Sequence, residues 1–174
     1  WESVSCGQEN GTSYVHAKTK KTGFEVSVAM RNYTAIEGAS VAWDSTTEAT
    51  HMNVCECAIF NVKQGQNLQV NKFAAVLSSM NHDVASLDGK AAERATAGAA
   101  QGYEALRNEH VAAWHKKWET SDIEIDGDAE AQQGIRFNIF HMNQTFTGVD
   151  DRLNIGPKGF TGEKYGGSTY WDTE

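Results

Sequence analysis

The chain has 174 residues, of which 40% are hydrophobic and 22% charged, and its formal net charge is −8. This composition is typical of a globular protein with one domain, or parts of two, and a sizeable core. The acidic balance argues against nucleic acid and anionic membranes as partners, because both require a basic surface. No apolar run approaches the roughly 18 residues of a membrane-spanning helix, and no signal peptide is visible, so we expect a cytoplasmic protein.

Cys6, Cys55 and Cys57 are the cysteines of the sequence. Three cysteines, an odd and sparse number, suit a reducing compartment better than a disulfide framework. Cys55 and Cys57 lie two apart in a strand-like run, so their side chains are expected on one face. As half of a metal site they would need further ligands at suitable spacing, and no second pair exists. We therefore favour half-buried strand cysteines that pack as small hydrophobes.

Residues 12–73 alternate mostly with a period of two, which is typical of antiparallel strands. A short strand is expected around Tyr14, a denser one over 52–62, and another opening at Leu68. The clearest alternation covers 24–31, where the apolar positions predicted to face the core are Phe24, Val26, Val28 and Met30. Strands without intervening helices indicate an antiparallel meander or sandwich.

Helical character begins near Ser86. Asp88 is a candidate N-cap, and residues 90–119 are rich in good helix formers. Gly98 and Gly102 each weaken the helix by roughly 1 kcal/mol relative to Ala, so they either divide it into two helices or allow a close helix crossing.

The second half of this helical region carries an apolar stripe of Val111, Trp114 and Trp118. His110 and His115 flank the stripe, but a separation of five places them on different faces and argues against a metal pair. An extended link at 122–125 and a turn at 126–128 are expected next. A further helix then presents Ile135, Ile139, Met142 and Phe146 on one face.

Residues 154–174 hold five of the sixteen glycines and the only proline of the chain, together with Phe160, Tyr165, Tyr170 and Trp171. Glycine joints, aromatic rings and carboxylates in one stretch favour an ordered loop at a polar-ligand pocket. The stretch is no P-loop, because Glu163 separates Gly162 from Lys164 and no hydrophobic strand precedes it.

The sharpest signal in this stretch is the pair Trp171-Asp172. An indole offers a flat platform for the C–H face of a pyranose ring, and a neighbouring carboxylate accepts hydrogen bonds from adjacent sugar hydroxyls. A packed core tryptophan beside a helix-capping aspartate would give the same spacing. The residues alone leave both interpretations open.

The run Asn-Ile-Gly-Pro-Lys-Gly-Phe-Thr-Gly-Glu-Lys-Tyr-Gly-Gly, followed by Tyr-Trp-Asp-Thr-Glu174, resembles the signature of glycoside hydrolase family 65, the family of maltose, trehalose and kojibiose phosphorylases. The upstream pattern of Trp114 and Trp118, then Ser121-Asp-Ile and Gly127-Asp, is also similar to that family. The resemblance is strong over 114–174 and consistent in order over the strands. Within the family, the fit is closest to the maltose phosphorylases.

The resemblance implies a mixed α and β fold: part of an antiparallel β-sandwich, then linker helices, then the first segment of an (α/α)6 barrel. Residues 1–86 would close the N-terminal sandwich domain, 87–120 would be the helical linker, and 121–174 would begin the catalytic barrel with its glycine-rich loop. We accordingly expect the chain to be a piece of a larger enzyme and to be inactive alone.

Family resemblance also implies an inverting disaccharide phosphorylase, with maltose as the expected substrate. Inorganic phosphate would be the co-substrate, with no other cofactor and no metal, and the full-length enzyme would be a homodimer. Trp171 and Asp172 match the family pair that binds the non-reducing glucose. Glu174 does not match the general acid, a glutamate expected downstream. A hydrolase of the same family, such as a trehalase, and a non-catalytic sugar-binding module are the alternatives.

Overall fold

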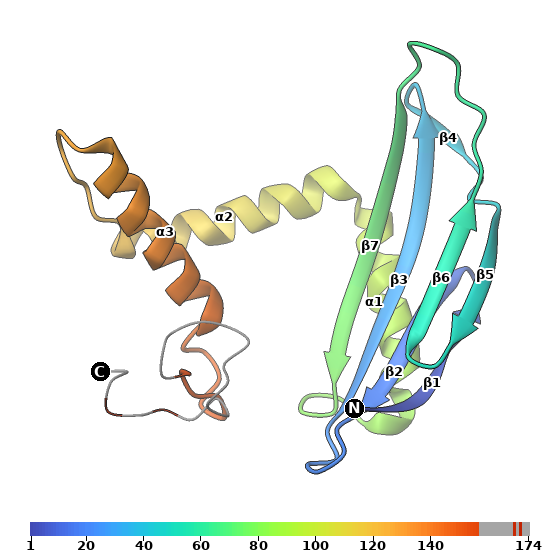
Figure 1. The fold of residues 1–174 in the computed structure, drawn as a ribbon, viewed down its shortest axis with the longest axis horizontal. Helices are drawn as coiled ribbons and strands as arrows, with labels where there is room; N and C mark the ends of the chain where they lie inside the picture. Colours follow the sequence, from blue (N-terminus) through green and yellow to red (C-terminus); the bar gives the residue numbers. More distant parts are fainter. Residues whose placement is uncertain (157–168, 170, 172–174) are drawn as a thin grey trace. The chain divides into compact units, whose positions relative to one another are not determined.

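The structure, a computed structural model, describes residues 1–156, 169 and 171 (Figure 1). Its helices and strands follow in the order β1 (Glu2–Glu9), β2 (Thr12–Lys18), β3 (Glu25–Ile36), β4 (Ala39–Val41), β5 (Ser45–Thr50), β6 (Asn53–Ala58), β7 (Leu68–Ser78), the short 3-10 helix η1 (Val84–Ser86), α1 (Leu87–Gln101), α2 (Tyr103–Ser121) and α3 (Ala129–Thr145). This succession of antiparallel strands and then helices confirms the expected mixed fold class.

The main sheet is built around the long strand β3. β1 pairs with β2, and β2 with β3, while β7 pairs with the other edge of β3 from Val26 to Ile36. β4 pairs with the end of β3, and β5 and β6 form a separate antiparallel hairpin. All these pairings are antiparallel, as the alternating sequence predicted.

Two-residue turns with positive φ connect β1 to β2 and β3 to β4. Asn10 and Gly11, between β1 and β2, have φ of 52° and 73°, and Glu37 and Gly38, between β3 and β4, have φ of 51° and 79°. Positive φ at both central residues is what a type I′ turn requires, and its twist matches that of the strands. β1 was not among the predicted strands, although Asn-Gly is the strongest short hairpin signal.

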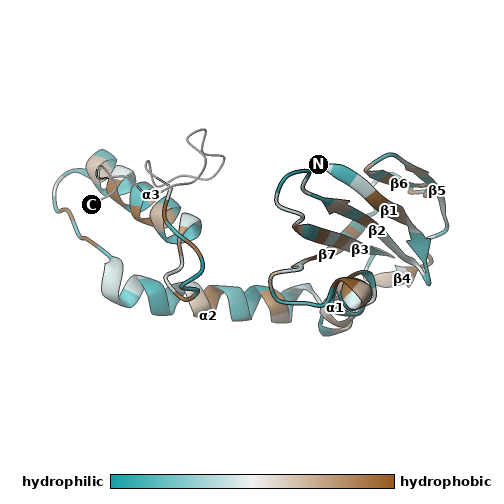
Figure 2. Cartoon of the chain, turned by 90° about the horizontal axis from the view of Figure 1, so that it is seen from below, coloured by the Kyte–Doolittle hydropathy of each residue, from teal (hydrophilic) through white to brown (hydrophobic). Residues whose placement is uncertain are grey.

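The buried face of β3 is the opposite of the predicted one. Ser27 and Ala29 are fully buried, whereas Val28 is 39% exposed. Helix α1 lies over this face of the sheet (Figure 2), and Ala29 packs there with Ala75, Ala91 and Ala95. Small side chains let the helix approach the strands closely, so size rather than hydrophobicity selected the covered face.

The cysteine pair lies on the outer side of the β5–β6 hairpin. Cys55 and Cys57 share one face, as predicted, with their Sγ atoms 3.8 Å apart, but both are exposed rather than half-buried. Inward positions of β6 are taken by Val54, Glu56 and Ala58. The strand also ends at Ala58, four residues before its predicted end.

The helical region divides at Gly102, which has a φ of 86° and separates α1 from α2. A residue with a Cβ is strained at this φ, so glycine favours the break here. Ser86 rather than Asp88 is the N-cap of α1. Asp88 lies in the first turn, where its carboxylate contacts His16 of β2 instead of capping the helix.

A buried ionic cluster joins α1 to the sheet. His16 is 4% exposed, and its Nε2 lies 3.0 Å from Glu25 Oε2 while its Nδ1 lies 3.0 Å from Asp88 Oδ1. Lys18 Nζ lies 3.2 Å from the other oxygen of Glu25. Since ionised carboxylates only accept, both imidazole contacts are hydrogen bonds when both ring nitrogens carry protons.

Replacing His16 by alanine is expected to lower the free energy of unfolding by about 3 kcal/mol, because it removes a partner of the buried Glu25 carboxylate. Lys18→Ala is the matched control, since it removes the more exposed partner of the same Glu25 carboxylate. This control is expected to cost at most about 1 kcal/mol. Urea denaturation followed by circular dichroism measures both; equal losses would show that His16 does not anchor the cluster.

Candidate functional site

The chain forms two compact units, residues 1–109 and 110–174, and the predicted glucose-binding stretch belongs to the second. In this unit the rings of Trp114 on α2 and Phe140 on α3 pack with centroids 4.8 Å apart. Trp118 and Phe140 also line a hollow of about 580 Å³, with Gln132 and Arg136. Aromatic packing therefore joins the two helices that precede the glycine-rich stretch.

Helix α3 begins and packs largely as its sequence predicted. The Asp128 side chain accepts a hydrogen bond of 2.9 Å from the amide of Ala131, as expected for an N-cap. Ile135 and Ile139 are half-buried, but Met142 is 64% exposed, so its predicted place on the apolar face is wrong. Phe140, which is half-buried, contacts Trp114 with its ring.

The link between α2 and α3 is held by side chains of α3. Arg136 donates two hydrogen bonds to the carboxylate of Asp122, at 2.8 and 2.6 Å. Gln132 donates to the carbonyl of Ile123 and accepts from the amide of Ile125. The Arg136 guanidinium holds the pKa of the Asp122 carboxyl below its usual range. This link has no helix or strand, as predicted, but its backbone is fixed.

An ion pair marks the entry to the glycine-rich stretch. Arg152 donates to both carboxylate oxygens of Asp150, at 2.8 and 2.6 Å, and its amide donates to the same carboxylate at 3.1 Å. These hydrogen bonds lower the pKa of Asp150 to about 2. The carboxylate therefore stays ionised and paired throughout the physiological pH range.

Described residues from the two ends of the stretch lie side by side. The Thr169 hydroxyl donates to the carbonyl of Ile155 at 2.9 Å and accepts from the Asn154 amide at 3.3 Å. Trp171 is 88% exposed. Asp172 and Glu174 lie outside the described residues.

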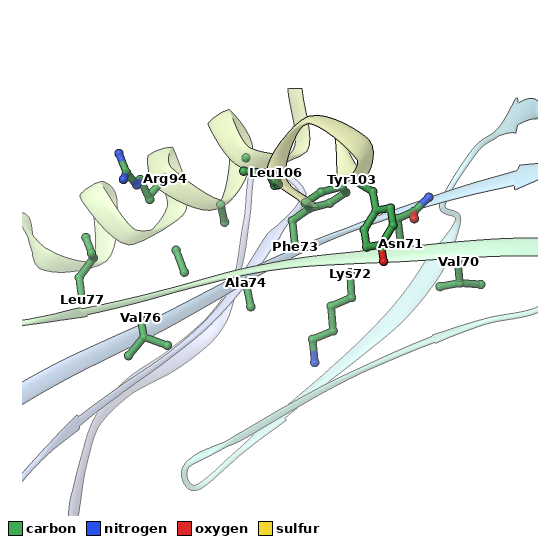
Figure 3. A pocket seen from close by; sticks show the side chains of 13 residues that line it. Val70, Asn71, Lys72, Phe73, Ala74, Val76, Leu77, Arg94, Tyr103 and Leu106 are labelled. Atoms are coloured by element: carbon green, nitrogen blue, oxygen red, sulfur yellow. The ribbon is translucent and has the colours of Figure 1, made fainter. Parts of the chain in front are cut away.

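A hollow of about 680 Å³ in unit 1 lies along β7 beside α1 and the start of α2. Figure 3 shows Phe73 and Tyr103 on the helix side of β7, and Lys72 and Val76 on the other. The described side chains that line this hollow include no acid–base pair. No group of three or more metal-binding side chains occurs in the described part of the chain, and none of the described helices is long and apolar enough to cross a membrane.

Comparison with known proteins gives the family. Residues 1–117 match the N-terminal domain of glycosyl hydrolase family 65, and residues 136–174 match its central catalytic domain. The chain belongs to glycosyl hydrolase family 65. The catalytic-domain match begins within α3 and includes the glycine-rich stretch, which is where the sequence motif is densest.

Relatives in this family include several phosphorylases. Over its whole length the chain is 40% identical to maltose phosphorylase of Bacillus subtilis, of which it covers 22%. Over 92% of its length it is 29% identical to α,α-trehalose phosphorylase of Thermoanaerobacter brockii, of which it covers 20%. It is 33% identical over 70% of its length to a kojibiose phosphorylase of Caldanaerobacter subterraneus, of which it covers 16%.

The fold is also similar to a solved structure. A chain named as a kojibiose phosphorylase from the human microbiome matches with a TM-score of 0.79 and 23% identity, covering 99% of this chain and 22% of that one. This likeness supports the order of strands and helices. The chain spans about a fifth of the length of these relatives.

Replacing Arg152 by glutamine is expected to raise the pKa of Asp150 from about 2 toward its ordinary value near 3.8. Because folding depresses this pKa, the pairing is complete above pH 3.8 and is lost as the pH falls through 2. The carboxyl carbon resonance of labelled aspartate, followed against pH, measures the shift. Arg136→Gln is the matched control, because it should raise the pKa of Asp122 and leave the pKa of Asp150 unchanged.

Proposed function

We propose that the protein, in its full-length form, is an inverting disaccharide phosphorylase that converts maltose and phosphate to β-glucose 1-phosphate and glucose. The observation that carries this proposal is the 40% identity to a maltose phosphorylase along the whole chain. Identity to the trehalose phosphorylase is 29% over a similar span. Relatives that act on the other two disaccharides thus match less closely or over less of the chain.

The reaction has simple requirements. A carboxylic acid donates its proton to the glycosidic oxygen as the bond to the anomeric carbon breaks. A phosphate oxygen forms the new bond to the same carbon from the opposite face, with inversion. Phosphate thereby takes the position that a base-activated water has in an inverting hydrolase. No cofactor beyond phosphate as co-substrate is needed.

Within this chain we assign glucose binding to Trp171 and Asp172 and assign no residue as general acid, which we expect to be a glutamate beyond Glu174. The exposed indole of Trp171 supports the assignment, because a ring-stacking platform needs a free face. Asp172 would accept hydrogen bonds from neighbouring hydroxyls of the same glucose.

The proposed domain order is a sandwich domain closing at 86, a linker over 87–120 and a barrel beginning at 121. The hydrogen bonds of Thr169 to Asn154 and Ile155 support a glycine-rich stretch whose ends are tied together. Residues near both ends can then be held on one wall of a substrate pocket. We also propose that the full-length protein is a homodimer and is located in the cytoplasm.

The decisive assay incubates the full-length protein with maltose, trehalose or kojibiose, with and without phosphate. We expect phosphate-dependent cleavage of maltose, with the other two disaccharides at least ten-fold slower, and proton NMR showing the β anomer of glucose 1-phosphate. Cleavage without phosphate would indicate a hydrolase, and sugar binding without cleavage would indicate a non-catalytic module. Release of the α anomer would contradict inversion.

Trp171→Ala in the full-length protein is expected to lower kcat/KM for maltose by about ten- to a hundred-fold, since lost stacking contacts of about 1.5–3 kcal/mol correspond to that ratio. Trp171→Phe keeps a flat ring and should retain most of the activity. Initial-rate kinetics at saturating phosphate give the values. Unchanged kinetics in the alanine variant would remove Trp171 from the glucose site.

A further inference from the structure

The edge of β3 opposite β7 has a notch where its pairing partner changes. β2 pairs with β3 as far as Met30, and β4 pairs with it from Thr34 onward. Between these points the segment 31–33 has no strand partner on that edge among the described residues. A hollow of about 410 Å³ opens there, and the side chains that matter for its chemistry are Gln8, Arg31, Asn32, Tyr33, Trp43 and Asp44.

Glu56 fixes two side chains that line this hollow, those of Asn32 and Trp43, by accepting hydrogen bonds from them. Its carboxylate accepts a 2.9 Å hydrogen bond from Asn32 Nδ2 and a 2.5 Å hydrogen bond from Trp43 Nε1, and it also accepts from the Ser13 hydroxyl. Burial by itself raises the pKa of Glu56, but these hydrogen bonds outweigh it and leave the pKa below its usual range. Asn32 and Trp43 are therefore held by an ionised carboxylate.

Orientation of Arg31 is equally well determined. Its Nε donates to the Tyr33 hydroxyl at 2.8 Å, and its Nη1 donates to the carbonyl of Asn10 at 2.9 Å. The guanidinium carbon lies 5.7 Å from the centre of the Tyr33 ring. Within the described part of the chain, its Nη2 donates to no side chain or carbonyl, so one edge of the guanidinium keeps a donor for a ligand.

The hollow thus offers rings, donors and acceptors in fixed positions. Trp43 has its indole N–H engaged by Glu56, so it contributes ring surface, and Tyr33 is 39% exposed. Arg31 supplies a donor. The side-chain oxygen of Asn32, Oδ1, accepts a hydrogen bond from no described residue. The exposed Asp44 supplies an anionic acceptor and balances the charge of Arg31.

We propose that this hollow, lined by Arg31, Asn32, Tyr33, Trp43 and Asp44, binds a neutral saccharide. Sugars present apolar C–H faces and hydroxyls that both donate and accept, which matches ring surface beside planar polar groups. A phosphorylated or nucleic-acid ligand would need an excess of basic groups, and Asp44 opposes it. The site uses none of the residues assigned to glucose binding in the proposed reaction, and it does not depend on that reaction.

Hydrogen exchange with mass spectrometry on the full-length protein tests the proposal, because it locates binding along the chain. Maltotetraose is the probe, and sorbitol at the same concentration is the control for a non-specific polyol effect. We expect maltotetraose, but not sorbitol, to slow exchange of amides in peptides covering 31–33 and 40–45. Protection elsewhere alone, or equal protection by sorbitol, would overturn the site.

Variants then connect the protection to the lining side chains. Trp43→Ala and Arg31→Gln are each expected to raise the maltotetraose concentration for half-maximal protection of 31–33 and 40–45 at least ten-fold. Gln66→Ala, outside the hollow, should leave it unchanged. Because Trp43 also contacts Glu56 and the ring of Phe60, thermal unfolding checks its fold, and Arg31→Gln decides the question if Trp43→Ala unfolds.

The outcome is separable from that of the proposed phosphorylase activity. Neither Trp43→Ala nor Arg31→Gln is expected to change kcat for maltose phosphorolysis by more than two-fold. Protection at 31–33 and 40–45 in a protein without phosphorolysis would sustain the saccharide site and refute the reaction. Phosphorolysis with no protection there, or protection that survives both variants, would refute the saccharide site.

Discussion

The imidazole of His16, held between the carboxylates of Glu25 and Asp88, joins the elements on which unit 1 depends. Charges removed from water cost several kcal/mol each unless their polar atoms are paired, so β2, β3 and the first turn of α1 have to meet at this point. Once Asp88 is placed, Ala91 and Ala95 follow on the same side of the helix and reach the sheet. The ionic cluster thereby sets where the connecting helices begin.

A second carboxylate organises the opposite side of the same sheet. Glu56 of the β5–β6 hairpin accepts hydrogen bonds from side chains of β2, β3 and the segment before β5, which fixes the hairpin against the sheet. Glu25 and Glu56 both occupy strand positions that the predicted alternation assigned to the outward face. Each is stable there because hydrogen-bond donors surround it.

In the second unit, the proposed glucose-binding stretch follows α3. Aromatic contacts between Trp114 and Phe140 hold the two helices, and the Asp150–Arg152 pair and Thr169 hold described residues at the ends of the glycine-rich stretch. The proposed phosphorolysis depends on this region, whereas family membership rests on matches to both units. The proposed saccharide site in unit 1 uses none of the residues of this region.

Sequence by itself determined the antiparallel strands, the helical region after Ser86, the turn at 126–128 and the family, because local propensities and a long motif carry them. The assignments of Trp171 and Asp172 to glucose binding stay predictions. Tertiary structure alone decided which face of β3 is buried and how the Asp88 and Glu56 carboxylates are used. Period-two alternation shows that a strand has two faces, but the small residues and hydrogen-bond partners that choose between them come from distant parts of the chain.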